Sequence, residues 1–318
     1  MARVLVTRRL TPAAEAAIAA RHDATFRAEA VPLTPAEAAA ALRDYDGIIP
    51  TVGDAFAAPA FAGAGLRARV LANFGAGTNH IDAGAARAAG VAVTNTPDVV
   101  TDATADIAVM LLLMTARRAS EGEAILRAGR WQGWAPTQFL GTHVGGRTAG
   151  IVGMGRIGKA VARRLALGFG MEVVFFNRSP VADPGVPARQ LDSLDAVMRA
   201  ADFVVLAVPG GPATRHLIGA AELAALGPQG FLINVSRGDV VDEAALIAAL
   251  EDGTIAGAGL DVFEREPDVP EALRRAPRTS LTPHIGTAAE EVRTAMGLRA
   301  LDNLDAVLAG RAPRDPVG

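Results

Sequence analysis

A glycine-spaced turn between an apolar run and a helical pattern constrains this chain more than any other feature. Residues 149–152 read as a buried strand, glycines follow at Gly153, Gly155 and Gly158, and residues 159–167 have apolar side chains at helical spacing. In such a unit the first glycine permits a tight turn, the second lets a pyrophosphate approach the backbone, and the third lets helix and strand pack closely. The pattern therefore predicts a βαβ unit that binds a dinucleotide at the helix N-terminus.

The residues after the next strand bear on which dinucleotide is bound. A carboxylate about 20 residues beyond the glycines would bind the adenosine ribose 2′-hydroxyl and repel a 2′-phosphate. Asn177 takes this place nineteen residues after Gly158, and Arg178 and Ser179 follow it. With a guanidinium there and no carboxylate, the segment favours NADP. NAD stays open, because no second basic residue follows until Arg189.

Composition limits the class of protein. A length of 318 residues with 50% hydrophobic residues predicts two domains of ordinary size. The net charge of −3, without a basic run of five residues, gives no reason to expect a nucleic-acid partner. The chain has no cysteine, which excludes disulfides, thiolate nucleophiles and cysteine metal sites. Its apolar runs are too short for a signal peptide or a membrane span, so we expect a cytoplasmic protein with no membrane partner.

Short apolar runs alternate with helical patterns along the chain, which predicts doubly wound parallel sheets. The first series of strands is expected at residues 3–7, 47–50, 70–73 and 91–95, with helices at 13–21 and 35–43. The second series is expected at residues 148–153, 172–176, 203–208, 231–235, 257–262 and 280–282. Residues 101–120 are apolar on nearly every face and predict one helix buried between the domains. We expect the last helix, residues 288–308, to return to the first domain.

Three polar residues follow strands of the second series, where ligands of open α/β sheets bind. Arg237, Glu266 and His284 could together reduce a keto acid: the arginine holds a carboxylate or polarises a carbonyl, and a histidine held by a glutamate delivers a proton. Each also has an ordinary structural interpretation. Arg237 could cap a helix or pair with Asp239, Glu266 could face solvent, and His284 could be structural. The five histidines form no close pair and no HExxH occurs, so metal catalysis has little support.

Five motifs in order give the chain a wider resemblance. These are residues 73–82, the glycine fingerprint, and residues 234–238, 260–267 and 282–286. With them the chain resembles the D-isomer-specific 2-hydroxyacid dehydrogenases, and is most similar to their glyoxylate/hydroxypyruvate reductase branch. The resemblance implies two doubly wound α/β domains: a Rossmann-type dinucleotide-binding domain at residues 99–286, inserted in a discontinuous, flavodoxin-like substrate domain at residues 1–98 and 287–318.

The resemblance also implies site residues. Arg237 would bind the substrate, His284 would be the acid/base held by Glu266, and the backbone of Gly75, Ala76 and Gly77 would bind the substrate carboxylate. Residues implied to contact the cofactor are Thr104, Gly153, Gly155, Arg156, Ile157, Gly158, Asn177, Arg178, Ser179, Val208, Pro209, Thr214, Val235, Ser236, Asp261, His284 and Gly286.

The resemblance also implies a homodimer that forms through the cofactor domain and an aromatic arm within residues 120–140. Trp134 in this arm would lie near the partner's substrate, and its alternative is a hydrophobic anchor within its own subunit.

The predicted function is NAD(P)H-dependent reduction of a small 2-keto acid to the D-2-hydroxy acid. Glyoxylate, hydroxypyruvate, pyruvate and bulkier acids stay open as substrates. One alternative is a nicotinamide-sensing, corepressor-like binding protein. Another is an NAD-dependent D-2-hydroxyacid dehydrogenase, for example one that acts on D-3-phosphoglycerate.

Overall fold

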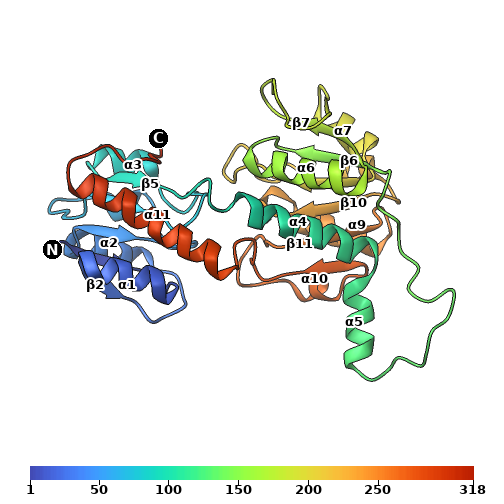
Figure 1. Cartoon of the computed structure of the whole chain (residues 1–318), viewed down its shortest axis with the longest axis horizontal. Helices are drawn as coiled ribbons and strands as arrows, with labels where there is room; N and C mark the ends of the chain where they lie inside the picture. Colours follow the sequence, from blue (N-terminus) through green and yellow to red (C-terminus); the bar gives the residue numbers. More distant parts are fainter. The chain divides into compact units, whose positions relative to one another are not determined.

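The computed structural model describes residues 1–318 and divides into two compact units (Figure 1). The first unit comprises Met1–Val100 and Thr287–Gly318, and the second is Thr101–Gly286. The first segment of the first unit ends at Val100, two residues beyond the boundary expected at residue 98. Each unit is a parallel sheet covered by helices on both faces, which confirms the predicted fold class.

The first unit holds a five-stranded sheet in the order β2-β1-β3-β4-β5, the flavodoxin-like order. Its strands are β1 (Arg3–Val6), β2 (Asp23–Phe26), β3 (Gly47–Ile49), β4 (Val70–Ala72) and β5 (Ala92–Thr94), all paired in parallel. The sequence pattern did not predict β2. This strand lies at the sheet edge with alternating exposed and half-buried residues, so it has no apolar run.

Side chains that alternate along the strands of the first unit point to opposite faces of the sheet and contribute to two separate cores. The helical elements are α1 (Pro12–Arg21), α2 (Pro35–Asp44), η1 (Ala58–Phe61), α3 (Ala83–Ala88) and α11 (Glu290–Leu308). Val4 and Val6 face Ile18 of α1 and Leu301 of α11, whereas Leu5 faces the core covered by α2, η1 and α3. The final helix of the chain therefore packs beside the first one (Figure 1).

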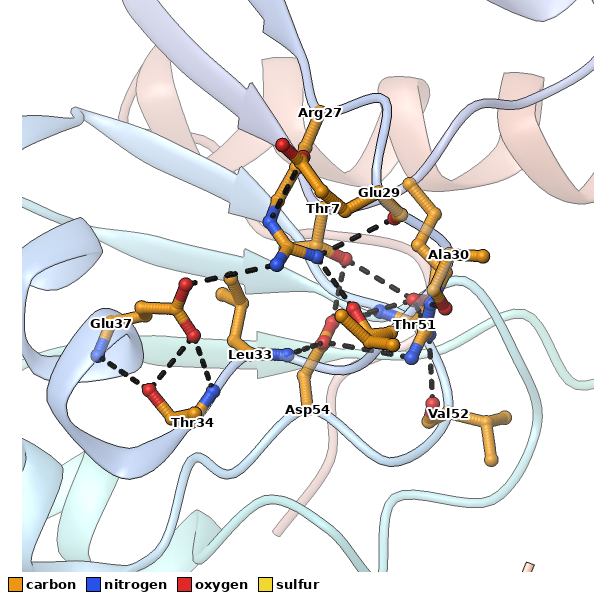
Figure 2. Close-up of polar contacts among 12 residues, drawn as sticks. Thr7, Arg27, Glu29, Ala30, Leu33, Thr34, Glu37, Thr51, Val52 and Asp54 are labelled. Atoms are coloured by element: carbon orange, nitrogen blue, oxygen red, sulfur yellow. Dashed lines mark hydrogen bonds and ion pairs between the residues drawn. The ribbon is translucent and has the colours of Figure 1, made fainter. Parts of the chain in front are cut away.

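A buried carboxylate joins the loops that follow three neighbouring strands of this sheet (Figure 2). Asp54 is fully buried and accepts from the Thr7 hydroxyl at 2.5 Å, the Thr51 N–H at 2.8 Å and the Leu33 N–H at 2.8 Å. Arg8 lies 4.0 Å from the same carboxylate and donates to the Val52 carbonyl at 2.8 Å. Burial lowers the pKa of Arg8, while the charge of Asp54 opposes that shift. The cluster fixes the carboxyl edge of the sheet.

The second unit holds a seven-stranded sheet in the order β12-β11-β10-β9-β6-β7-β8. Its strands are β6 (Thr148–Val152), β7 (Glu172–Phe176), β8 (Arg189–Gln190), β9 (Phe203–Leu206), β10 (Phe231–Asn234), β11 (Gly257–Leu260) and β12 (Thr279–Leu281). Counted from β6, this is the Rossmann order 3-2-1-4-5-6 with one further strand. The pattern missed β8 because it has two polar residues at the sheet edge.

Helices cover both faces of this second sheet. They are α4 (Thr101–Ala116), α5 (Ala119–Arg127), α6 (Arg156–Phe169), α7 (Leu194–Ala200), α8 (Ala220–Leu226), α9 (Glu243–Glu251) and α10 (Glu271–Arg275), and a short turn η2 (Gly238–Val240) follows β10. One core lies under α4 and α6, and the other under α7, α8, α9 and α10. None of the helices is both long enough and apolar enough to cross a membrane.

The single helix expected at residues 101–120 is wrong in its extent. α4 ends at Ala116, and α5 starts at Ala119 after Arg118 adopts the left-handed conformation with φ of 54°. Arg118 pairs with Glu121 at 2.7 Å in the new helix, so polar contacts replace the apolar periodicity at this break. After α5 the chain continues as an arm without regular structure, visible in green in Figure 1.

Candidate active site

Three glycines shape the turn between β6 and α6. Gly153 has a φ of 96°, and a Cβ there would lie 2.7 Å from the Ala207 carbonyl oxygen. A Cβ on Gly158 would collide with the Gly153 carbonyl oxygen. Gly155, the N-cap of α6, has open space where its Cβ would be. This division matches what a dinucleotide site requires, with two glycines needed for packing and one leaving the helix N-terminus accessible to a diphosphate.

The end of β7 leads into the turn predicted to select the cofactor. Asn177 donates from Nδ2 to the Ser179 carbonyl at 3.0 Å, while the Arg178 and Ser179 side chains are exposed. No acidic side chain occupies these three positions. The turn therefore offers a cation and a hydroxyl, and it has no acidic side chain that would repel a phosphate.

Arg237 follows β10 in a loop organised by a buried asparagine. Asn234 accepts from the Ser236 N–H at 3.0 Å and from the Ser236 hydroxyl at 2.7 Å, and it donates to the Arg237 carbonyl at 2.8 Å. The Arg237 stem passes so close to Gly210 that a Cβ there would lie 2.7 Å from it. Burial lowers the pKa of Arg237, and the charges of Glu266 and Asp239 oppose that shift. The loop thus holds a half-buried cation near a carboxylate.

His284 and Glu266 form a close pair beyond β12 and β11. His284 Nδ1 lies 2.7 Å from Glu266 Oε2, and Glu266 Oε1 accepts from the Phe263 N–H at 3.0 Å. Burial raises the pKa of Glu266, but the hydrogen bond and charge of His284 and the charge of Arg237 together bring it below its ordinary value. Glu266 is thus held as a carboxylate, and the imidazole is oriented with Nε2 as its other polar atom.

Asp261 ties the histidine loop to β11. Its carboxylate accepts from the Ile285 N–H at 2.7 Å, the Thr282 hydroxyl at 2.7 Å and the Gly286 N–H at 2.8 Å. These bonds span His284, whose φ of 52° is uncommon for a residue other than glycine. Burial raises the pKa of Asp261, and the three donors and His284 oppose that rise. Asp261 therefore holds the loop that presents the imidazole.

Other residues expected at the cofactor lie around these loops. Thr104 of α4 is buried beside Gly286, 3.6 Å from where a Cβ would stand. Thr214 is buried and donates to the Pro209 carbonyl at 2.7 Å, so it closes the loop after β9. Val208 packs against Gly153. In the loop after β10, Val235 and Ser236 are buried. The first two residues of α6 are Arg156 and Ile157. All belong to the second unit.

The glycine-rich loop of the first unit follows β4. Asn73 Nδ2 donates to the Gly75 and Gly77 carbonyls at 2.9 and 3.1 Å, and Asn95 Nδ2 donates to the Ala76 carbonyl at 2.7 Å. The Gly75 N–H already donates to the Asn73 carbonyl. The N–H groups of Ala76 and Gly77 are therefore the ones that can bind an anion, while Gly75 supplies the turn with a φ of 154°.

Trp134 lies in the arm after α5 with 81% of its surface exposed. Trp131 is 52% exposed and donates from Nε1 to Gln138 at 3.3 Å. Leu126, near the end of α5, and Leu140, within the arm, are exposed as well. The alternative of an anchor within its own subunit does not fit Trp134, since the side chain is not packed in this chain.

Sequence reasoning named the motifs that contain Asn234 and Thr282 without assigning either residue a role, and it placed Asn95 only at the end of a predicted strand. Each organises a loop that carries a site residue: Asn234 that of Arg237, Thr282 that of His284 through Asp261, and Asn95 that of Ala76. Their common signal is a polar residue at or directly after the end of an apolar strand, where it can reach the backbone of the next loop. The same position in the sequence therefore marks both ligand-facing and loop-holding residues.

Comparison with known proteins identifies the family. The family model of the D-isomer specific 2-hydroxyacid dehydrogenase, NAD binding domain, matches residues 109–286. A glyoxylate reductase of Thermococcus gammatolerans is 44% identical over 278 residues, covering 86% of this chain and 82% of that protein.

Two solved structures are similar over the whole length. An NADPH-dependent glyoxylate/hydroxypyruvate reductase from Sinorhizobium meliloti, in complex with NADP and malonate, is 40% identical with a TM-score of 0.86, covering 99% of this chain and 96% of that one. A protein from Thermus thermophilus is 42% identical with a TM-score of 0.91, covering 99% of this chain and 100% of that one. The chain therefore belongs to the D-isomer-specific 2-hydroxyacid dehydrogenases, in their glyoxylate reductase branch, and is an oxidoreductase that uses a nicotinamide cofactor.

Proposed function

We propose that this protein reduces a small 2-keto acid of the glyoxylate or hydroxypyruvate type to the D-2-hydroxy acid, with NADPH as the preferred reductant. The observation that carries the proposal is the 2.7 Å pair of His284 and Glu266 in the same unit as Arg237 and the glycine turn. The second unit would be the dinucleotide-binding domain and the first the substrate domain. Relatives named as glyoxylate reductases support the substrate class.

The cofactor, when bound, supplies the hydride that reduces the carbonyl carbon of the keto acid. The chain's part is to supply the proton and to stabilise the charge. As negative charge develops on the carbonyl oxygen, His284 donates a proton from Nε2 to that oxygen. Before this transfer the imidazole is protonated, and the Glu266 carboxylate at Nδ1 stabilises its positive charge. The products are a hydroxyl group on the substrate and a neutral imidazole.

Arg237 would bind the substrate through its carboxylate and polarise the carbonyl next to it. A guanidinium suits this because it is planar and permanently charged, and its two donors match a carboxylate. Its partial burial strengthens the attraction for an anion, since the low-dielectric surroundings screen the charge less than water would. The N–H groups of Ala76 and Gly77 would bind the same carboxylate from the substrate domain.

Preference for NADPH would come from the turn after β7. Asn177 carries no charge at the position where a carboxylate would repel the 2′-phosphate, and Arg178 and Ser179 would bind that phosphate. The relative from Sinorhizobium meliloti, described as NADPH-dependent, supports this assignment. Arg178→Ala should raise the Kd for NADPH and leave that for NADH unchanged.

We also propose a homodimer in which the arm after α5 contacts the partner and Trp134 reaches the partner's substrate. The exposed Trp131, Trp134 and Leu140 form an apolar stretch with no cover in this chain. Light scattering should give twice the chain mass. Trp134→Ala should then raise KM for the keto acid by a larger factor than it raises the dissociation constant of the dimer.

The test of the whole proposal is a matrix of glyoxylate, hydroxypyruvate, pyruvate and a bulkier 2-keto acid against NADPH and NADH. Loss of reduced-nicotinamide absorbance should be fastest with a small keto acid and NADPH. Chiral analysis of the product should give the D-hydroxy acid where the product has a stereocentre. Absence of turnover with every pair would contradict the reductase and favour the nicotinamide-sensing alternative.

A further inference from the structure

One glutamine side chain on the edge strand β8 reaches three backbone positions of the turn after β7. Gln190 donates from Nε2 to the Asn177 carbonyl and to the Ser179 carbonyl, both at 3.2 Å. Its Oε1 accepts from the Val181 N–H at 3.0 Å. The side chain is half-buried, and all of its polar atoms are used within this turn. Such a set of contacts fixes the course of the backbone from residue 177 to residue 181.

The backbone of Gln190 is paired with the neighbouring strand of the sheet. Its backbone pairs with Phe175 of β7, and the Leu191 N–H donates to the Phe175 carbonyl at 2.8 Å. Phe175 is itself buried in the core under α4 and α6. A two-residue strand would be a weak edge by itself, but here it anchors one side chain against the central sheet. Gln190 therefore connects the exposed turn to a strand whose Phe175 lies in the core of the unit.

The contacts determine which groups the turn directs outward. In a planar trans peptide the carbonyl and the following N–H point in opposite directions. Because the Asn177 carbonyl points to Gln190, the N–H of Arg178 points away from it. The Ser179 carbonyl, which would repel a phosphate, also points to Gln190 and to the Asn177 amide. The Arg178 N–H is thereby left on the outer side of the turn, and the Arg178 side chain is exposed there.

We propose that Gln190 is a positioning residue for cofactor selection: it holds the 177–181 turn in the conformation that receives the 2′-phosphate of NADPH. This rests on the proposed NADPH preference through Arg178 and Ser179. Gln190 itself would not touch the phosphate. It would act by keeping the two carbonyl oxygens occupied and the Arg178 peptide oriented.

The test uses Gln190→Met, which keeps the length of the side chain and removes its polar atoms, with Gln229→Met as the matched control at an exposed glutamine of the same unit. The Kd values for NADPH and NADH are measured by fluorescence titration of the full chain. Gln190→Met should raise the Kd for NADPH about five- to tenfold, the effect of one or two lost hydrogen bonds, and leave NADH within about twofold. Gln229→Met should change neither Kd.

A second measurement tests the positioning role of Gln190 separately from the proposed NADPH preference. Hydrogen exchange of the peptide that covers residues 177–182 should become faster in Gln190→Met, at the Val181 N–H above all. An unchanged exchange rate would contradict the proposal that Gln190 holds this turn. Faster exchange with an unchanged ratio of the NADPH Kd to the NADH Kd would overturn its role in selection. If Arg178→Ala leaves that ratio unchanged while Gln190→Met raises it, the assignment of Arg178 fails and the positioning role of Gln190 stands.

Discussion

His284 Nδ1 lies 2.7 Å from Glu266 Oε2, and the second oxygen of that carboxylate accepts from the Phe263 backbone at 3.0 Å. Glu266 is therefore fixed from both sides, and it fixes the imidazole in turn. A ring held at Nδ1 exposes Nε2 as its proton-donating atom. The pair thus has the arrangement that a general acid needs before any substrate arrives.

Replacing Glu266 with glutamine should slow reduction. The variant keeps a hydrogen-bonding side chain at Nδ1 of His284 but removes the negative charge that stabilises the proton donor. The fall in kcat should be about 10- to 100-fold at neutral pH, since one component of acid–base catalysis is weakened. Steady-state rates of the variant and the wild-type protein at neutral pH give this quantity.

The stability of the same variant provides an independent check. Glu266 has a folded-state pKa below its ordinary value, so its ionised form stabilises the fold above the unfolded-state pKa. This contribution disappears as the pH falls through the folded-state pKa. The Tm difference between the wild-type protein and Glu266→Gln should therefore be largest near neutral pH and shrink below about pH 4. A difference that grows toward acid pH would contradict the assigned ion pair.

Arg237→Lys should separate charge from geometry in substrate binding. Lysine keeps the positive charge but loses the planar fork, so a carboxylate can no longer be bound by two parallel hydrogen bonds. We expect KM for the keto acid to rise about 10- to 100-fold, the equivalent of roughly 1.5–3 kcal/mol. The Kd for NADPH should stay within about twofold of the wild-type value. Equal losses for substrate and cofactor would indicate collapse of the loop that Asn234 organises.

Asp261→Asn should disturb the histidine loop. The carboxylate accepts from three donors, and an amide in its place would present an NH₂ group to at least one of them. Two opposed donors leave a buried hydrogen bond unmade, at a cost of about 1–3 kcal/mol. We expect kcat to fall about 100-fold because the imidazole is displaced. Thr282→Val, which removes only one of the three donors, should give a smaller loss in the same assay.

Strand positions could be predicted where the apolar run was strong, as for Glu172–Phe176, and so could the order of polar residues after them. The edge strands Asp23–Phe26 and Arg189–Gln190 could not, because edge strands are held by backbone pairing without an apolar run. The break of the long helix at Arg118 was missed for a related reason. Hydrophobic periodicity does not reveal a left-handed residue stabilised by local polar contacts.

The polar residues that organise the site were harder to predict than those expected to bind ligands. Arg237 and His284 could be named because their chemistry suits a keto acid. Asn234 bonds to groups two and three residues ahead of it, in a loop that one sequence does not distinguish from an ordinary turn. Gln190 and Asp54 bind groups up to 13 and 47 residues away, so their roles depend on which loops the fold brings together. Such long-range partners leave no periodic signal in one sequence.

Asp54→Ala should destabilise the first unit. The substitution leaves the buried N–H groups of Leu33 and Thr51 without their acceptor and removes the partner of the Arg8 charge. We expect a loss of about 3 kcal/mol and a Tm lower by roughly 10 °C. Asp44→Ala, at an exposed position in the same unit, should leave Tm unchanged. A Tm for Asp54→Ala equal to that of the control would contradict the structural role of the cluster.

The glycine turn allows a last prediction in which stability and cofactor binding respond differently at two positions. A methyl group on Gly155 meets no atom within 4 Å, so Gly155→Ala should fold with an unchanged Tm. The same methyl group would stand where the diphosphate approaches the N-terminus of α6, so the Kd for NADPH should rise at least about tenfold. Gly158→Ala places its methyl group against the Gly153 carbonyl and should lower Tm as well as affinity. Thermal melting and nucleotide titration of both variants test this directly, and tight NADPH binding by Gly155→Ala would place the diphosphate elsewhere.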